Sequence, residues 1–294
     1  MALASNQVQL VEVSPRDGLQ NEARTLLPSV RAELIKRIAA DGAQRIEAVS
    51  FAHPGRVPQM AGAEEVLREA TEHAGPTLTA LVLNHRGFER AVAASVREIN
   101  VVVLATDTFS QRNQGMSRAT AISSCSEIIV EARRLGIRTT ATVGAAFGCP
   151  FEGDVSLSVT MSVIEATLDA GVDEICVADT IGVGVPRQVL ALAKAMSNGA
   201  PDVPLRGHFH DTRNTGIANL LTAAESGFSA LDVSVGGIGG CPFAPAATGN
   251  VATEHAIYAL ERSGFTTNRD VDIALATGQW IREKLGIAVG SCAV

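Results

Sequence analysis

The sequence predicts an α/β protein, a closed (β/α)8 TIM barrel with an extra helix at its C-terminal end. Short aliphatic runs alternate with longer helix-like segments through eight successive units of the 294-residue chain, as parallel strands joined by helical crossovers require. Hydrophobic residues make up 46% of the chain and aromatic residues 4%, so the core is aliphatic and an antiparallel sandwich is disfavoured. A doubly wound open sheet is the alternative, and it is less favoured because no G-x-G-x-x-G motif follows the first aliphatic run.

Eight short aliphatic runs, bounded by glycine, proline or polar residues, are predicted as strands. The run at Ile99–Ala105 is largely apolar, which is typical of a parallel strand buried on both faces. In chain order, the predicted strands are Val8–Val13, Arg45–Ala48, Leu78–Leu83, Ile99–Ala105, Arg138–Val143, Asp173–Ala178, Leu205–His210 and Leu231–Val235.

Helices are predicted between the strands, where apolar residues recur every three or four positions. Gly42 and Gly136 mark helix ends, and Pro186 marks a helix start. The polar segment Thr108–Ser117 is predicted as a loop. In chain order, the predicted helices are Leu27–Asp41, Ala63–His73, Gly87–Ala94, Ala119–Leu135, Ser158–Ala170, Pro186–Met196, Thr215–Ser226, Thr253–Ser263 and, as the extra helix, Asp272–Leu285.

No linker or shift in composition divides the chain, so residues 1–294 are predicted to form a single domain. The barrel is expected to span about residues 8–263, and a C-terminal helical extension is expected over residues 270–294.

Charge and cysteine content exclude several classes of protein. The net charge is -7 and no run of Lys or Arg occurs, so nucleic acid is not an expected partner. No apolar stretch reaches the roughly 18 residues that a membrane helix needs. The five cysteines contain no C-x-x-C pair, which argues against a disulfide framework or a structural zinc site. With no leader-like segment at the start, a reducing cytoplasm is the expected location.

Polar and ionisable residues cluster where the predicted strands end. Because active sites of such barrels lie at the C-terminal ends of the strands, these residues are expected to meet at one mouth. They are Arg16 and Asp17 after the first strand, Glu47 at the second, Asp179 after the sixth, His208 and His210 on the seventh, and Asn250 beyond the eighth.

The sharpest local signal is His208-Phe209-His210, because residues two apart on a strand point to the same face. Taken alone, two hydrogen-bonded histidines are about as common as a metal site. Asp17 would complete a set of two histidines and one carboxylate, and Asn250 could add a neutral oxygen. Mixed nitrogen and oxygen ligands suit Mg²⁺ or Mn²⁺ better than structural zinc. Asp211 faces the other way and is interpreted as structural, orienting a helix start.

The charged residues beside this set have two interpretations each. Arg16 would stabilise negative charge that develops on a substrate, or form a salt bridge at the mouth. Glu47 and Asp179 would orient a metal-bound imidazole or carry protons. For Glu47, a structural pair with Arg16 is the competing interpretation.

Gly236–Asn250 contains five glycines in fifteen residues and is predicted as a long loop that closes over the mouth. It carries Cys241, which would reach the site when the loop closes. The tetrapeptide GCPF also occurs at Gly148–Phe151, which makes Cys149 a rival in a segment interpreted as a fixed turn. Cys125 and Cys176 are expected in the core.

Other candidate contacts lie around the same mouth. Arg112 and Asn113, in the predicted loop after the fourth strand, would bind phosphate or ribose or would be solvated surface. Gln20, close to Arg16 in sequence, is assigned to substrate binding with them. His85, after the third strand, could touch a ligand.

Several of these motifs together resemble the 3-hydroxy-3-methylglutaryl-CoA lyases, within the DRE-type TIM-barrel metallolyases. The similarity runs in order from about Val8 to Ser263. Related synthases carry a further C-terminal domain, for which this chain has no room. The motifs are VSPRDGLQNE, IEAVSFAHPGRVPQM, FGCPFEG, ADTIGVGVP, HFHDTRNTGIAN and GGIGGCPFAPAATGN.

The resemblance implies an enzyme that uses Mg²⁺ or Mn²⁺ to cleave a 3-hydroxyacyl-CoA thioester into acetyl-CoA and a β-keto acid such as acetoacetate. A homo-oligomer is expected. Arg16 would stabilise the enolate oxygen, Cys241 would be catalytic, and Asp179 or His208 would be the base, with Glu47 as a further acidic residue. The implied metal ligands are Asp17, His208, His210 and Asn250.

Departures from the usual family pattern are expected to change which acyl group the enzyme accepts. They lie at Arg213–Gly216, Leu83–His85 and Gln111–Met116. A lyase for a longer 3-hydroxyglutaryl-CoA or for a citramalyl-type ester is therefore an alternative. An aldolase acting on a free hydroxy-oxo acid and a catalytically silent binding barrel are the others, and both are less favoured.

Overall fold

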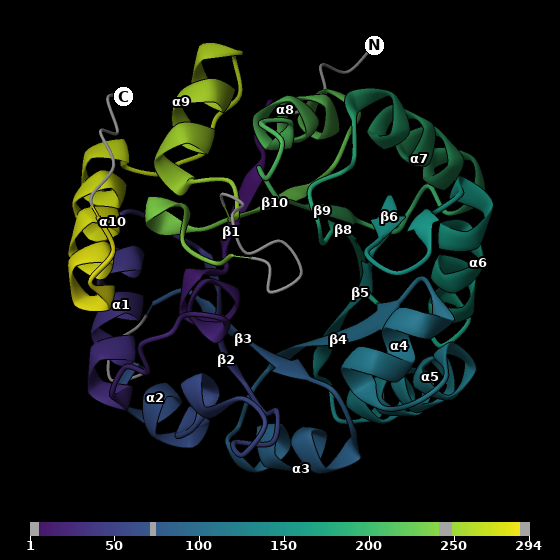
Figure 1. The fold of residues 1–294 in the computed structure, drawn as a ribbon, viewed down its shortest axis with the longest axis horizontal. Coiled ribbons are helices and arrows are strands. Elements are labelled where there is room, and N and C mark those ends of the chain that lie inside the picture. The colour runs from purple at the N-terminus through teal and green to yellow at the C-terminus, as the bar shows by residue number, and fades with distance from the viewer. Residues whose placement is uncertain (1–5, 71–74, 241–248, 289–294) are drawn as a thin grey trace.

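A closed barrel of eight parallel strands forms the centre of the molecule, which confirms the predicted fold class (Figure 1). The structure is a computed structural model that describes residues 6–70, 75–240 and 249–288. Around the barrel the strand order is β1-β10-β9-β8-β5-β4-β3-β2. The strands are β1 (Gln9–Glu12), β2 (Arg45–Ser50), β3 (Thr77–Val82), β4 (Glu98–Leu104), β5 (Arg138–Gly144), β8 (Glu174–Asp179), β9 (Leu205–Phe209) and β10 (Ala230–Val233).

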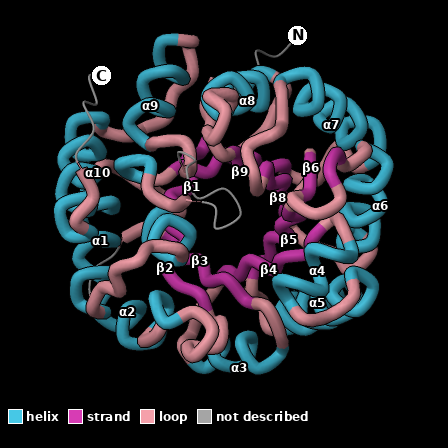
Figure 2. Tube along the Cα trace, in the orientation of Figure 1, coloured by secondary structure: helices cyan, strands magenta, loops and turns pink. Residues whose placement is uncertain are grey.

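Helices surround the strands in an outer ring (Figure 2). Side-chain caps stabilise the N-terminal ends of some of these helices. At one of them, the Asn84 side chain accepts a hydrogen bond from the Gly87 N–H. The ring comprises α1 (Pro28–Ala40), α2 (Ala63–Ala70), α3 (His85–Ala93), α5 (Arg118–Arg134), α6 (Leu157–Leu168), α7 (Pro186–Gly199), α8 (Gly216–Glu225) and α9 (Thr253–Arg262). The predicted extra helix is α10 (Val271–Leu285).

Two local predictions were wrong, and a third, the fixed turn around Cys149, was right but incomplete. The segment predicted as a polar loop contains helix α4 (Asp107–Gln114), which ends at Gly115 in a left-handed conformation. Strand β2 continues two residues beyond its predicted end and contains an irregularity between Glu47 and Val49. The turn that contains Cys149 includes a small hairpin of β6 (Gly148–Cys149) and β7 (Gly153–Asp154).

Aliphatic side chains fill the space between the barrel and the helices, whereas charged side chains occupy part of the barrel interior. Arg45, Glu98, Arg138 and Glu174 are the first residues of four strands, so they form an ionic layer at the N-terminal end of the barrel. The polar side chains Asp17, His208 and His210 lie at the opposite end. Within the described residues, no helix is long and apolar enough to span a membrane.

Candidate active site

A short π-helical turn, η1 (Ser14–Gly18), follows β1 and carries Arg16 and Asp17. The backbone N–H groups of both residues donate to the Val13 carbonyl, which fixes the turn. These two residues therefore lie on a turn beyond the strand, rather than at the strand end itself. The turn brings Asp17 next to the histidines of β9.

Asp17, His208 and His210 form one cluster, in which potential metal-ligating atoms lie within 4.8 Å of one another. The two imidazole rings have centroids 5.1 Å apart. Asn250 joins the cluster through a backbone bridge to His210, and its amide Nδ2 donates to Asp17 Oδ2 over 2.9 Å. The structure thus brings together the four residues that the sequence predicts as ligands.

The donor set fits a divalent cation. The Nδ1 atom of His208 lies 3.0 Å from Asp232 Oδ2, and a carboxylate only accepts, so Nδ1 carries the hydrogen and Nε2 is left as the donor atom. Among the residues that the structure describes, the buried Nδ1 of His210 has no hydrogen-bond partner. Burying a ring nitrogen without a partner costs free energy. Coordination of a metal ion by one ring nitrogen is a common reason for such an arrangement.

The charge state of the cluster also suits a cation. Burial opposes ionisation of Asp17, but the positive charge of Arg16 and the neighbouring histidines hold its pKa well below the ordinary value. Burial and the nearby His208 lower the pKa of His210 to about 4. At neutral pH the cluster therefore offers the Asp17 carboxylate and the neutral His210 imidazole, the forms that bind metals, whereas, against the effect of burial, the hydrogen bond to Asp232 raises the pKa of His208.

A cavity of about 190 Å³ lies beside the cluster. Two wider grooves, of about 560 and 700 Å³, lie on the outer helices and contain none of the cluster residues. The apolar lining residues of the cavity include Leu81, Leu83, Val102, Leu104 and Phe109. The other lining residues are Arg16, Asp17, Gln20, Asn21, Asn100, Asn113, Gln114, Thr142, Gly144, Ala178, Thr180, His208, His210, Asp232 and Gly240.

Glu47 lies below this cavity and does not line it. Its side chain is fully buried, forms an ion pair with Arg16 Nε, and accepts a hydrogen bond from Asn100 Nδ2 over 3.0 Å. Arg16 also pairs with Asp17 over 2.6 Å and itself lines the cavity. In this geometry Glu47 positions Arg16, which was the competing interpretation of that carboxylate.

Asp179 is turned away from the cavity, although it ends strand β8. Its two carboxylate oxygens accept hydrogen bonds from the backbone N–H groups of Val183 and Gly184, at 2.9 and 2.8 Å. Burial raises its pKa in spite of these bonds. The structure therefore does not bring Asp179 into the cavity, because its own loop occupies both oxygens.

The remaining candidate residues also divide into those that line the cavity and those that do not. Gln20 and Asn113 line the cavity, whereas the guanidinium of Arg112 lies over the Phe151 ring, 4.4 Å from its centroid. His85 was expected near the mouth, but it starts α3 and pairs with Glu127 at an exposed position. Asp211 accepts from the backbone N–H of Gly216, the first residue of α8, which confirms its helix-orienting role.

The described cysteines are buried. Cys125 and Cys176 lie in the core as predicted, and burial raises the pKa of the Cys125 thiol to about 12. Cys149 is buried beside Thr106 Oγ1, at 3.0 Å. Cys241 and Cys292 lie outside the described residues.

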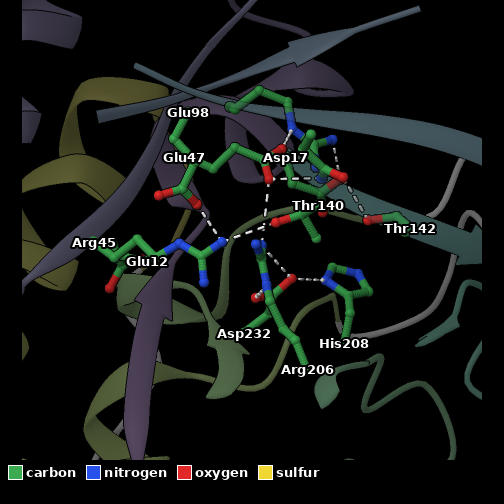
Figure 3. A network of polar contacts seen from close by, with 12 residues as sticks. Glu12, Asp17, Arg45, Glu47, Glu98, Thr140, Thr142, Arg206, His208 and Asp232 are labelled. Atoms are coloured by element: carbon green, nitrogen blue, oxygen red, sulfur yellow. Dashed lines mark hydrogen bonds and ion pairs between the residues drawn. The ribbon is translucent and has the colours of Figure 1, made fainter. Parts of the chain in front are cut away.

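Sequence reasoning missed Asp232 and Arg206, which lie on adjacent strands inside the barrel. Asp232 holds His208, and Arg206 holds Asp232 (Figure 3). The signal was a charged residue within each of two short strands, LRGHF and ALDV, whose other residues are apolar except for His208.

The chain is similar to known lyases along almost its whole length. A family model described as HMGL-like matches residues 7–281. (R)-citramalyl-CoA lyase of Chloroflexus aurantiacus is 42% identical, over 95% of this chain and 91% of that one. Hydroxymethylglutaryl-CoA lyase of Pseudomonas mevalonii is 40% identical, over 96% and 93%. An HMG-CoA lyase structure from Acinetobacter baumannii, in complex with coenzyme A and 3-methylmalate, has a TM-score of 0.92 at 36% identity and covers 99% of this chain and 95% of that one.

Proposed function

Because this chain belongs to the HMGL-like family and is a carbon–carbon lyase, we propose that it cleaves a 3-hydroxy-3-methylglutaryl-CoA-like thioester into acetyl-CoA and acetoacetate. The observation that carries this proposal is the cluster of Asp17, His208 and His210 beside a cavity that Arg16 also lines. The coenzyme A complex of the Acinetobacter baumannii relative supports a CoA thioester as substrate.

The proposed reaction is a retro-Claisen cleavage. The 3-hydroxyl loses its proton, the C2–C3 bond breaks as the C3 oxygen becomes a ketone, and the bonding electrons move into an enolate of the thioester. Protonation of the enolate at C2, which in net terms returns the proton lost from the 3-hydroxyl, then gives acetyl-CoA. The two charges that need stabilisation are those of the hydroxyl oxygen and of the enolate oxygen.

The residues of the cavity divide these two tasks. Asp17, His208, His210 and Asn250 would hold Mg²⁺ or Mn²⁺, which when bound lowers the pKa of the substrate hydroxyl. Arg16, which lines the cavity next to Asp17, brings a positive charge that would stabilise the enolate. For His208 we propose the role of metal ligand rather than base, because Asp232 occupies its Nδ1 and only Nε2 remains for either task.

We also propose Cys241 as the catalytic cysteine, on the resemblance of the GGCP motif to that of the family. Replacing Cys241 with Ala is expected to lower turnover and to leave the affinity for Mn²⁺ unchanged. Calorimetry and an assay of acetyl-CoA release would measure the two quantities separately.

A citramalyl-type ester is the second candidate substrate, because a (R)-citramalyl-CoA lyase is 42% identical to the chain. The two thioesters differ by one methylene between C3 and the free carboxylate. The test is a panel of 3-hydroxy-3-methylglutaryl-CoA, both citramalyl-CoA enantiomers, a longer 3-hydroxyglutaryl-CoA and a free hydroxy-oxo acid, with product identification. The proposal expects the highest kcat/KM on 3-hydroxy-3-methylglutaryl-CoA. Turnover of the free acid alone would contradict it.

A further inference from the structure

Arg206 is a fully buried charge inside the barrel, below the metal-donor cluster. Its guanidinium pairs with Asp232 through Nε and through Nη2, the latter at 3.0 Å, and Nη2 also lies 3.3 Å from Glu47 Oε2. Its Nη1 is buried with no hydrogen-bond partner among the described residues. A buried, incompletely paired guanidinium is expensive, and an apolar side chain of similar volume is often at least as stable there. Stability alone therefore gives little reason for an arginine at this position.

The partners of Arg206 lead to two different parts of the proposed site. Asp232 accepts the hydrogen bond from His208 Nδ1, which leaves Nε2 of that ring toward the other metal donors. Glu47 pairs with Arg16, which lines the cavity and also contacts Asp17. Figure 3 shows Arg206 between these two carboxylates.

These contacts form one chain of alternating charge whose two ends are both candidate metal ligands. The three carboxylates and two guanidinium groups of the chain sum to one negative charge. That charge favours a divalent cation at the ends of the chain. In order, the chain is Asp17, Arg16, Glu47, Arg206, Asp232 and His208.

We propose that Arg206 is a positioning residue that orients His208 through Asp232 and Arg16 through Glu47. It touches neither the metal nor the substrate. Because the Arg206 guanidinium contacts both Asp232 and Glu47, loss of Arg206 should disturb both metal binding and the position of Arg16. The inference rests on the proposed function, since it assumes that His208 binds the metal.

The barrel contains a matched control in Arg45. This guanidinium is also buried and paired with two carboxylates, Glu98 and Glu174, but at the N-terminal end of the barrel. It has no described contact with the metal donors or with Arg16. Arg45→Lys should therefore lower stability without changing the site, whereas Arg206→Lys should change both.

The experiment titrates metal-free protein with Mn²⁺ by calorimetry and follows unfolding in urea. Arg206→Lys and Asp232→Asn are expected to weaken Mn²⁺ binding about 10- to 100-fold, as loss of a partner behind a metal ligand does. Arg45→Lys should bind Mn²⁺ like the wild type. Asp232→Asn is nearly isosteric, so it carries the test if Arg206→Lys does not fold.

Turnover at saturating Mn²⁺ tests the contacts that lead from Arg206 through Glu47 to Arg16. Asp232→Asn should recover much of its kcat once metal is saturating, whereas Arg206→Lys should not, because Arg16 stays displaced. Unchanged Mn²⁺ affinity in both folded variants, or an equal loss in Arg45→Lys, would overturn the inference. Full recovery of kcat by Arg206→Lys would overturn the coupling to Arg16. A wild type that binds no Mn²⁺ would instead overturn the proposed metal site, and the inference with it.

Discussion

The two histidines of β9 are held in different ways. His208 donates through Nδ1 to Asp232, while the buried Nδ1 of His210 has no partner within the described part of the chain. Both rings lie within reach of Asp17, whose low pKa keeps its carboxylate charged at neutral pH. Each of the three side chains thus offers an available donor atom, which is what a cation requires.

We predict that His208→Ala and His210→Ala each weaken Mn²⁺ binding by about 100-fold or more, because each removes a ligand rather than a partner behind one. Calorimetric titration of metal-free protein measures this. His255→Ala serves as the control, since that residue lies exposed on α9. Wild-type affinity in both β9 variants would show that the ligand assignment is wrong.

At the scale of elements, α10 packs closely against the short 3-10 helix η3 (Val235–Gly237), which follows β10. Gly278 of α10 lies so near η3 that a Cβ atom there would be 2.7 Å from the Gly236 nitrogen and 2.9 Å from its Cα. Arg282 of the same helix donates to the Gly236 carbonyl over 2.8 Å. The C-terminal helix therefore holds the backbone at the start of the glycine-rich segment.

Replacement of Gly278 by Ala is expected to lower the free energy of unfolding by about 2 to 3 kcal/mol, because two backbone segments must move apart to admit the methyl group. Gly199→Ala is the matched control, since a Cβ at that helical glycine meets nothing within 4 Å. Urea unfolding compares the two. Equal stability of the two variants would contradict the close packing of α10 on η3.

Element prediction succeeded where periodicity was strong and failed where composition was polar. The alternation of aliphatic runs and amphipathic segments is set by the barrel itself, so the sequence revealed all eight strands. Helix α4 was missed because Asp107–Gln114 is mostly polar, and only Phe109 and Ser110 of it are buried. Its helical form depends on tertiary contacts that a short window of sequence does not contain.

At the scale of the whole molecule, buried ion pairs occupy both ends of the barrel interior. At the N-terminal end, Arg45 holds Glu174 with hydrogen bonds of 2.8 and 2.6 Å. Burial opposes ionisation of Glu174, but Arg45 lowers its pKa below the ordinary value of 4.5. The carboxylate therefore stabilises the fold above that value, and this contribution is lost as the pH falls toward the lowered pKa.

The sign of this shift predicts the pH dependence of a variant. Glu174→Gln should lose about 3 kcal/mol of stability at pH 7, where it leaves a buried arginine with one partner fewer. At pH 4 the difference from the wild type should be smaller, because the wild-type carboxylate is partly protonated as the protein unfolds. Urea unfolding at both values measures it, with Glu33→Gln as control, since that half-exposed carboxylate pairs with Arg37 on the outer surface of α1. A difference that grows on acidification would contradict the assignment.

The candidate ligands could be predicted from the sequence because each signal was local: a pair two residues apart on a strand, and polar residues after strands. The contacts behind them could not. Asp232 meets His208 from the adjacent strand, and Arg206 meets Glu47 from across the barrel, at a separation of 159 residues. Asp179 also follows a strand, yet its carboxylate accepts hydrogen bonds from the loop after that strand and does not line the cavity. A position after a strand predicts the end of the barrel, and loop geometry decides which side chains face the cavity.

The most direct test of the account is whether the same protein sample gains and loses acetyl-CoA release with its metal. Wild-type protein is stripped with a chelator, assayed on 3-hydroxy-3-methylglutaryl-CoA, and assayed again after addition of Mg²⁺ or Mn²⁺. A metal-dependent lyase should show no turnover in the stripped sample and should release acetyl-CoA and acetoacetate in equal amounts after either ion is restored. Full activity without metal, or none with it on any 3-hydroxyacyl-CoA, would contradict the account.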